Sequence, residues 1–213
     1  IIPWNYPAQQ FGRSVGPALA VGNAAVVKPS EDACLTTLLM SQLALEAGLP
    51  AGALNIVAGL GESAGAALAN HPHINFMSFT GSPRVGTLVQ QATAKHFVGC
   101  MLELGGKSPQ LIFADADLDK ALPTVVKAII QHAGQTCSAG SRILVQKEIY
   151  NEFMAQVAEL FAKVRVGTPE MDLDCGPVMN VRQQSLVDGF RTDAIKSGIE
   201  LLAEGVFADG LDQ

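Results

Sequence analysis

Short apolar runs alternate with helical segments along this chain, and the alternation limits the possible fold more than any other feature. The runs at 24–27, 54–57 and 76–80 are each followed by turn residues and then by a segment with helical spacing. Strands that alternate with helices are typical of mainly parallel sheets. The sequence therefore predicts an α/β fold.

Turn and capping residues indicate where the predicted helices begin and end. Ser30 or Asp32 is suited to cap the helix after the first run, and Gly48 is suited to stop it. Ser82 followed by Pro83 is a typical helix start. The first of these helices carries four leucines on one face, namely Leu35, Leu38, Leu39 and Leu43.

The second half of the chain continues the same order. Further strands are predicted at 101–104, 110–113 and 143–145, and further helices at about 122–130, 149–161 and 182–196. Gly105 and Gly106 free the backbone to change direction, so we expect a domain border there.

Composition and charge exclude several classes of partner. The 213 residues are 48% hydrophobic, with a net charge of -6 and only 14 Lys plus Arg. Nucleic acid is not expected as a partner without a basic stripe, and no apolar run approaches the roughly 20 residues of a membrane helix. Four widely spaced cysteines and scattered histidines indicate neither a disulfide framework nor a metal site. We expect a reducing, cytoplasmic setting.

Cys137 stands among small and polar residues in the run GQTCSAGSR. This setting favours an exposed, attackable sulfur over an inert core thiol. Taken by itself, however, a lone cysteine is more often a small buried hydrophobe.

Five motifs, in this order along the chain, resemble those of the NAD(P)-dependent aldehyde dehydrogenase family. They are PWNYP at 3–7, KPSE at 28–31, FTGS at 79–82, LELGGKSP at 102–109 and GQTC at 134–137. The resemblance implies a partial, Rossmann-like NAD-binding domain at 1–105, followed by part of an α/β catalytic domain at 106–213. It corresponds to the middle of a longer family member, and the chain opens on Ile1 without a Met, so we expect a fragment.

The resemblance also implies a mechanism. Cys137 would attack the aldehyde carbon to form a thiohemiacetal and then a thioester. Asn5 would donate its amide to the oxyanion, and Glu103 would activate the water that releases a carboxylic acid. Because Leu102 and Leu104 flank Glu103, we expect an apolar setting for its carboxylate.

The implied cofactor is NAD, with NADP less favoured. Lys28 and Glu31 would contact the adenosine ribose, and the carboxylate would repel a 2′-phosphate. Gly61 and Gly65 would lie near the adenine, although this segment has one residue too many for a GxGxxG fingerprint. The other cofactor-binding positions implied are Ile2, Pro3, Trp4, Asn5, Ser30, Gly81, Ser82, Glu103, Leu104 and Gly105. No metal is expected.

Other functions remain open on the sequence alone. A CoA-acylating relative is the nearest rival, although Glu103 would compete by activating water. A cysteine-dependent esterase would use the same Cys137 and Glu103 without a redox step, and the fragment could also be catalytically incomplete. The resemblance implies a small-molecule aldehyde as substrate and a homo-dimer or homo-tetramer for the full-length enzyme.

Overall fold

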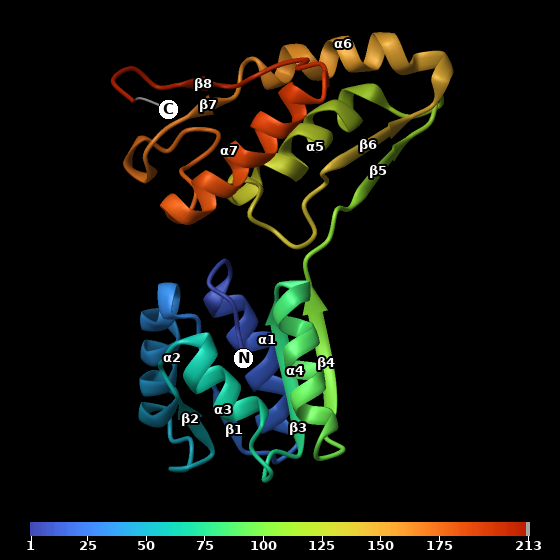
Figure 1. The fold of residues 1–213 in the computed structure, drawn as a ribbon. Helices are drawn as coiled ribbons and strands as arrows, with labels where there is room; N and C mark the ends of the chain where they lie inside the picture. The colour runs from blue at the N-terminus through green and yellow to red at the C-terminus, as the bar shows by residue number, and fades with distance from the viewer. Residues whose placement is uncertain (212–213) are drawn as a thin grey trace. The chain divides into compact units, whose positions relative to one another are not determined.

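The computed structural model describes residues 1–211 and divides into two compact units, residues 1–105 (unit 1) and residues 106–213 (unit 2) (Figure 1). In the part of the chain that is described, the strands form four two-stranded sheets, all of them parallel. The predicted α/β fold with parallel strands is therefore confirmed.

Unit 1 contains the first three strand-turn-helix repeats. Its elements are α1 (Pro7–Ala20), β1 (Ala25–Val27), the 3₁₀ turn η1 (Glu31–Ala33), α2 (Cys34–Glu46), β2 (Leu54–Ile56), the π-helical turn η2 (Gly61–Gly65), α3 (Ala66–Ala69), β3 (Phe76–Gly81), α4 (Pro83–Ala94) and β4 (Gly99–Leu104). Ser82 caps α4, as its position in the sequence predicted, whereas the Ser30 hydroxyl oxygen accepts from the Asp32 amide and caps the turn η1 rather than α2.

The first two residues of the chain connect the two sheets of unit 1. The Ile2 amide donates to the Lys28 carbonyl oxygen at 3.0 Å, and the Thr80 amide donates to the Ile1 carbonyl oxygen at 3.1 Å. Ile1 and Ile2 thus lie between the end of β1 and the end of β3. They bring the carboxyl ends of two strand pairs to the same region of the unit.

Helix α1 has no counterpart among the elements predicted from the sequence. It contains Gly12, Gly16 and an internal Pro17, all poor helix formers, which hide its periodicity. Packing compensates, because Phe11 and Val15 are buried in the core with Val27 of β1. Tertiary contacts, rather than local propensity, stabilise this helix.

The four leucines that the spacing places on one face of α2 do not pack into the core. Leu35, Leu38, Leu39 and Leu43 are all exposed. The helix instead packs through Met40 and Ala44, with Thr37 fully buried. Helical spacing identifies an apolar stripe, but this helix is apolar on more than one side and the pattern does not say which side packs.

Unit 2 repeats the strand-helix alternation. Its elements are β5 (Pro109–Ile112), α5 (Leu118–Ile130), the turn η3 (Gln131–Gly134), β6 (Arg142–Val145), the 3₁₀ turn η4 (Lys147–Ile149), α6 (Tyr150–Phe161), β7 (Arg165–Val166), the 3₁₀ turn η5 (Pro169–Met171), α7 (Val181–Lys196) and β8 (Val206–Phe207). The strands and helices predicted for this half begin and end within a few residues of these bounds. The short strand β7 was not predicted.

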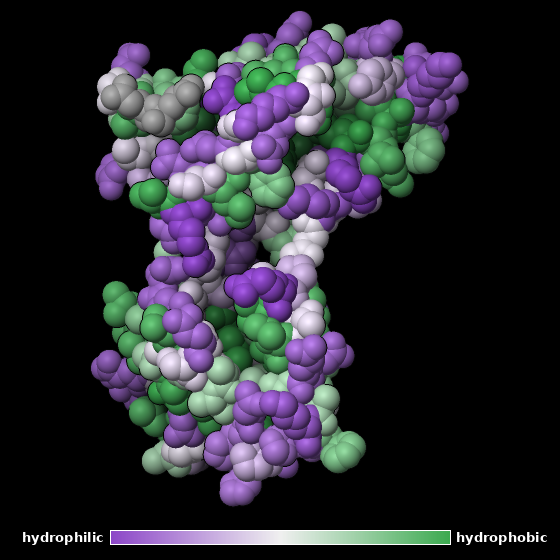
Figure 2. Space-filling model, in the orientation of Figure 1, coloured by the Kyte–Doolittle hydropathy of each residue, from purple (hydrophilic) through white to green (hydrophobic). Residues whose placement is uncertain are grey.

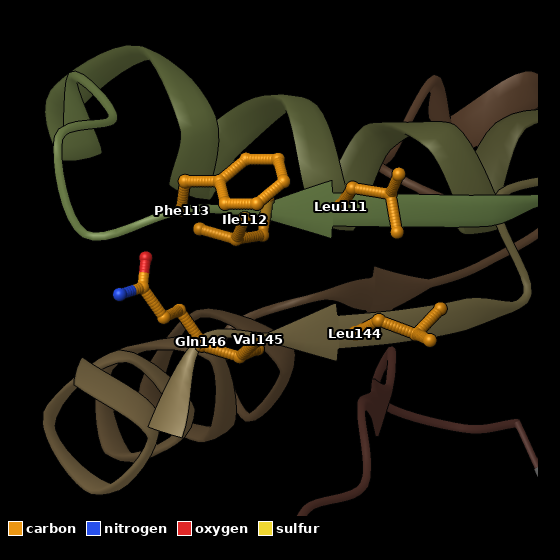
Figure 3. A pocket seen from close by; sticks show the side chains of 6 residues that line it. All are labelled: Leu111, Ile112, Phe113, Leu144, Val145 and Gln146. Atoms are coloured by element: carbon orange, nitrogen blue, oxygen red, sulfur yellow. The ribbon is translucent and has the colours of Figure 1, made fainter. Parts of the chain in front are cut away.

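Helices α5 and α6 pack against one face of the β5–β6 pair and leave the other face open. Ile112, Leu122, Val125, Phe153 and Val157 form the buried core between them. Side chains of a strand alternate between its two faces, so the outer face carries another set. A shallow hollow at the carboxyl ends of the two strands is lined by Leu111, Ile112, Phe113, Leu144, Val145 and Gln146, of which Ile112 and Val145 also contact the core (Figure 3). Apolar surface lies over these strands in Figure 2, and no lining residue is nucleophilic or ionisable.

Phe153 gives a test of this packing in unit 2. Its side chain is 0% exposed, whereas that of Phe190 on α7 is 71% exposed. Phe153→Ala should lower the free energy of unfolding by about 3–5 kcal/mol, because a buried ring is replaced by a cavity. Phe190→Ala, the matched control, should change it by about 0.5 kcal/mol or less. Urea denaturation of the chain measures both values, and equal losses would contradict the assigned core.

Candidate functional site

The carboxyl ends of β1, β3 and β4 carry most of the predicted cofactor residues of unit 1. Lys28 directly follows β1, and Gly81 ends β3. In the parallel β3–β4 pair, Thr80 is in register with Glu103 and Gly81 with Leu104. In open parallel sheets, ligands bind outside the carboxyl ends of the strands. We call this region of unit 1 the strand-end edge.

Lys28, Glu31 and Gly61 come together at the strand-end edge. The Lys28 Nζ lies 2.9 Å from the Glu31 Oε2, with the lysine side chain 4% exposed and the glutamate side chain 45% exposed. The pKa of Glu31 is lowered, first by the hydrogen bond from Lys28 and also by N–H groups of its own backbone and of Gly61. The carboxylate is therefore held ionised beside a glycine, where no side chain blocks the approach of a ligand.

The start of α4 supplies backbone donors at the same edge. The Ser82 hydroxyl oxygen accepts from the Val85 amide at 3.3 Å, and α4 continues for 12 residues. The first N–H groups of a helix and its dipole favour an anion. Gly86 lets α4 approach β4 closely, since a Cβ there would lie 2.6 Å from the Leu104 Cδ2. Of the other glycines expected to bind the cofactor, Gly65 is buried and Gly105 is exposed.

The segment of residues 2–5 enters the strand-end edge directly after the connection between β1 and β3. Ile2 is buried, and Pro3, Trp4 and Asn5 are half-buried. Asn5 and Glu103 belong to unit 1, whereas Cys137 belongs to unit 2.

The structure contradicts the apolar setting expected for Glu103. Its Oε1 lies 3.1 Å from the Arg13 Nη2, and the two side chains are 43% and 54% exposed. Because alternate strand residues point to opposite faces, Leu102 and Leu104 pack into the core on the other side of β4. Arg13 was missed because it lies on α1, the helix that the sequence did not predict.

Cys137 lies in a loop with unusual backbone geometry. The loop comprises residues 131–141 and is called the nucleophile loop below. His132, Ala133 and Gly134 have φ angles of 55°, 53° and 73°, which L residues other than glycine rarely adopt. Each such non-glycine residue costs of order 1–3 kcal/mol, and this kind of strain is concentrated at functional sites. The sequence pattern did not predict this left-handed backbone conformation.

Hydrogen bonds fix the start of the nucleophile loop. The Gln135 Nε2 donates to the His132 carbonyl oxygen at 3.0 Å, and its Oε1 accepts from the Met179 amide at 2.8 Å. Cys137 itself is exposed, as its small and polar neighbours predicted. The thiol is therefore accessible on a constrained backbone within unit 2.

Cys34, Cys100 and the histidines other than His132 lie outside the nucleophile loop, whereas the Cys175 Sγ lies 3.8 Å from the Ile130 carbonyl oxygen, next to its start. Cys34, Cys100 and Cys175 are half-buried, and burial raises the pKa of the Cys175 thiol. Within residues 1–211, no three His, Cys, Asp or Glu side chains are grouped so as to hold a metal ion. None of the helices in that range is long and apolar enough to cross a membrane.

Fold and geometry thus define an α/β protein with an ion pair and helix N–H donors at the strand-end edge of unit 1 and an accessible cysteine in unit 2. The family model described as "Aldehyde dehydrogenase family" matches residues 1–213. The chain belongs to the aldehyde dehydrogenase family.

Curated relatives and solved structures agree with this membership. Phenylacetaldehyde dehydrogenase of Pseudomonas fluorescens is 40% identical over 98% of this chain and 42% of its own length. A Burkholderia cenocepacia protein assigned to the aldehyde dehydrogenases is 58% identical, with a TM-score of 0.96 over 98% of this chain and 44% of that one. Betaine aldehyde dehydrogenase of Staphylococcus aureus, solved in complex with NAD+, is 36% identical, with a TM-score of 0.89 over 92% of this chain and 39% of that one. The chain thus spans about two-fifths of the length of these proteins.

The Lys28–Glu31 pair predicts a pH-dependent contribution to stability. Glu31→Gln should lower the free energy of unfolding at pH 7 by about 1 kcal/mol, a value limited by solvent screening of the exposed carboxylate. The folded-state pKa of Glu31 lies below its ordinary value of 4.5. The stabilisation is therefore complete above that value and is lost as the pH falls through the lowered pKa.

Denaturation of wild type and Glu31→Gln between pH 7 and pH 3 measures this difference. Glu200→Gln, at an exposed position of unit 2, serves as the control and should behave like wild type throughout. A Glu31→Gln difference that stays constant or grows on acidification would contradict the assigned interaction.

Proposed function

We propose that this chain is part of an NAD-dependent aldehyde dehydrogenase that oxidises a small aldehyde to a carboxylic acid. Membership of the aldehyde dehydrogenase family carries this proposal. Residues 1–105 are the partial NAD-binding domain and residues 106–213 the partial catalytic domain. The strand-end edge supports the first assignment, and the exposed Cys137 on its strained loop supports the second.

The strand-end edge fits a dinucleotide. Glu31 presents an ionised carboxylate that can accept hydrogen bonds from both ribose hydroxyls, and Lys28 holds it in place. Gly61 and Gly65 leave room for the adenine, and the start of α4 at Gly81 and Ser82 offers N–H donors to the phosphates. Bound NAD supplies the hydride acceptor. The same carboxylate would repel the 2′-phosphate of NADP, so NAD is the proposed cofactor.

Residues 2–5 complete the proposed cofactor edge. Ile2, Pro3 and Trp4 follow the connection between β1 and β3 and line the same end of the strands as Lys28. Ser30, Glu103, Leu104 and Gly105 belong to the loops and strand ends around them. The family resemblance supports the role of each of these residues.

Cys137 performs the covalent step in this proposal. Its thiolate adds to the aldehyde carbon to give a thiohemiacetal, whose oxyanion accepts hydrogen bonds from the Asn5 amide and the Cys137 backbone N–H. Hydride then leaves the substrate carbon, and a thioester remains on the sulfur. The exposure of Cys137 supports this role, since a buried thiol could not reach a substrate.

Glu103 completes the cycle as general base. Its carboxylate removes a proton from water, which adds to the thioester carbon, and Cys137 leaves as thiolate when the acid is released. In the structure this carboxylate contacts Arg13 and is 43% exposed, so water reaches it. Glu103 also favours hydrolysis over transfer of the acyl group to CoA.

The proposal extends to the setting of the protein. The substrate is a small-molecule aldehyde, and the full-length enzyme is a homo-dimer or homo-tetramer. The four free cysteines support a reducing compartment such as the cytoplasm. A cysteine-dependent esterase is the second candidate, supported by the same exposed Cys137. It would cleave esters but form no NADH from any aldehyde.

The role of Cys137 is tested by its replacement in the full-length protein. Cys137→Ala should reduce NADH formation from an aldehyde panel by at least about 10³-fold, because the covalent intermediate cannot form. Binding of NAD, measured by calorimetry, should be unchanged. Cys34→Ala is the matched control and should keep its activity. Turnover near wild type in Cys137→Ala would overturn the assigned nucleophile.

The role of Glu103 is tested by separating the two halves of the reaction. Glu103→Gln should leave the initial burst of NADH nearly unchanged and slow the steady state by about 10²-fold or more, because thioester hydrolysis loses its base. Glu159→Gln on α6 changes an exposed glutamate in unit 2 and should leave both phases as in wild type. Rapid-mixing measurements at saturating NAD resolve them. An unchanged ratio of burst to steady-state rate would count against this role.

A further inference from the structure

The side-chain amide of Gln110 joins strand β5 to both helix α5 and the nucleophile loop. Its Nε2 donates to the Gly140 carbonyl oxygen at 2.9 Å and to the Val125 carbonyl oxygen at 3.3 Å. Both N–H bonds of the amide are thus used. A reversed amide would direct its oxygen at two carbonyl oxygens, so this orientation is the favourable one.

Gly140 is held from two sides at this point. Its own amide donates to the Ala128 carbonyl oxygen at 3.0 Å. A Cβ added at Gly140 would lie 2.6 Å from both the Cδ and the Nε2 of Gln110. The Gln110 amide therefore occupies the space that a side chain at position 140 would need, and the end of the loop is fixed against α5 and β5.

Cys137 is three residues away from this anchor, inside a closed turn. The Ala139 amide donates to the Thr136 carbonyl oxygen at 3.1 Å, and the Ser141 amide donates to the Ala139 carbonyl oxygen at 2.8 Å. Ala139 is buried, whereas Cys137 is exposed. Any movement of Gly140 is thus transmitted through a short, hydrogen-bonded segment to the sulfur.

We propose that Gln110 is a positioning residue that holds the nucleophile loop, and with it the Cys137 sulfur, in its reactive placement. This inference rests on the proposed role of Cys137 as nucleophile. Gln110 acts through Gly140 and has no assigned contact with substrate. A displacement of about 1 Å at a reacting group can cost about 10²-fold in rate, so a single anchor of this kind is enough to matter.

Gln110→Met in the full-length protein tests the proposal. Methionine has a similar length and volume but no N–H donor, so packing is kept while both hydrogen bonds are lost. Gln146→Met is the matched control, because Gln146 lies at the opposite end of the same strand pair, where its Oε1 accepts from the Ala114 amide at 2.8 Å (Figure 3). Each variant removes side-chain hydrogen bonds to backbone, but only Gln110 bonds to the nucleophile loop.

Two readouts separate positioning from simple stability. The first is the rate at which iodoacetamide alkylates Cys137, followed by mass spectrometry of the peptide that contains it. The second is the rate of the NADH burst together with the KM for NAD. Gln110→Met should lower the alkylation and burst rates by about tenfold to 100-fold with an unchanged KM for NAD, and Gln146→Met should leave all three unchanged. Wild-type alkylation and burst rates in Gln110→Met would overturn the proposal.

A second variant covers the case in which Gln110→Met does not fold. Gly140→Ala places a methyl group against the Gln110 amide and should lower the alkylation rate in the same way, whereas a wild-type rate would overturn the proposal. Because alkylation needs no turnover, this test is independent of the proposed reaction. An active Cys137→Ala would refute the nucleophile, whereas an inactive Cys137→Ala with an unperturbed Gln110→Met would refute only the positioning role.

Discussion

The backbone hydrogen bonds of Ile1 and Ile2 are the interaction on which the site of unit 1 depends. The Lys28 carbonyl accepts from Ile2, and the Ile1 carbonyl accepts from Thr80, so this segment spans the two strand pairs. It adds backbone hydrogen bonds between the β1–β2 pair and the β3–β4 pair, and an isolated two-stranded ribbon is only marginally stable in water. With it, the carboxyl ends of β1 and β3 face one region, where a ligand can contact both.

Each chemical group proposed for the reaction is placed by neighbours that have no chemical role. Glu31 is held by a buried lysine, and Glu103 by an arginine on α1. In unit 2 the nucleophile loop combines left-handed residues with hydrogen bonds from Gln110 and Gln135. Strain in that loop persists only because these contacts over-determine its path.

The sequence predicted most strands and most helices because their apolar periods and capping residues are local signals. It missed α1, whose glycines and proline conceal a helix that packing stabilises, and therefore also missed Arg13 and its contact with Glu103. It did not show which face of α2 packs, since apolar residues occur on more than one side of that helix. Most of the residues proposed for the site were identified by the five sequence motifs, whereas Gln110 lies outside all of them. Its importance depends on a contact with Gly140, 30 residues further along the chain, which only a folded structure shows.

Amide hydrogen exchange of the full-length protein with and without NAD tests whether NAD binds at the strand-end edge of unit 1. Addition of NAD should slow exchange in the peptides that contain residues 28–31, 61–65 and 81–86. Peptides that contain β5 and β6 should exchange at the same rate with and without NAD. Unchanged exchange in all three strand-end segments at saturating NAD, or protection confined to other parts of the chain, would show that NAD does not bind at this edge.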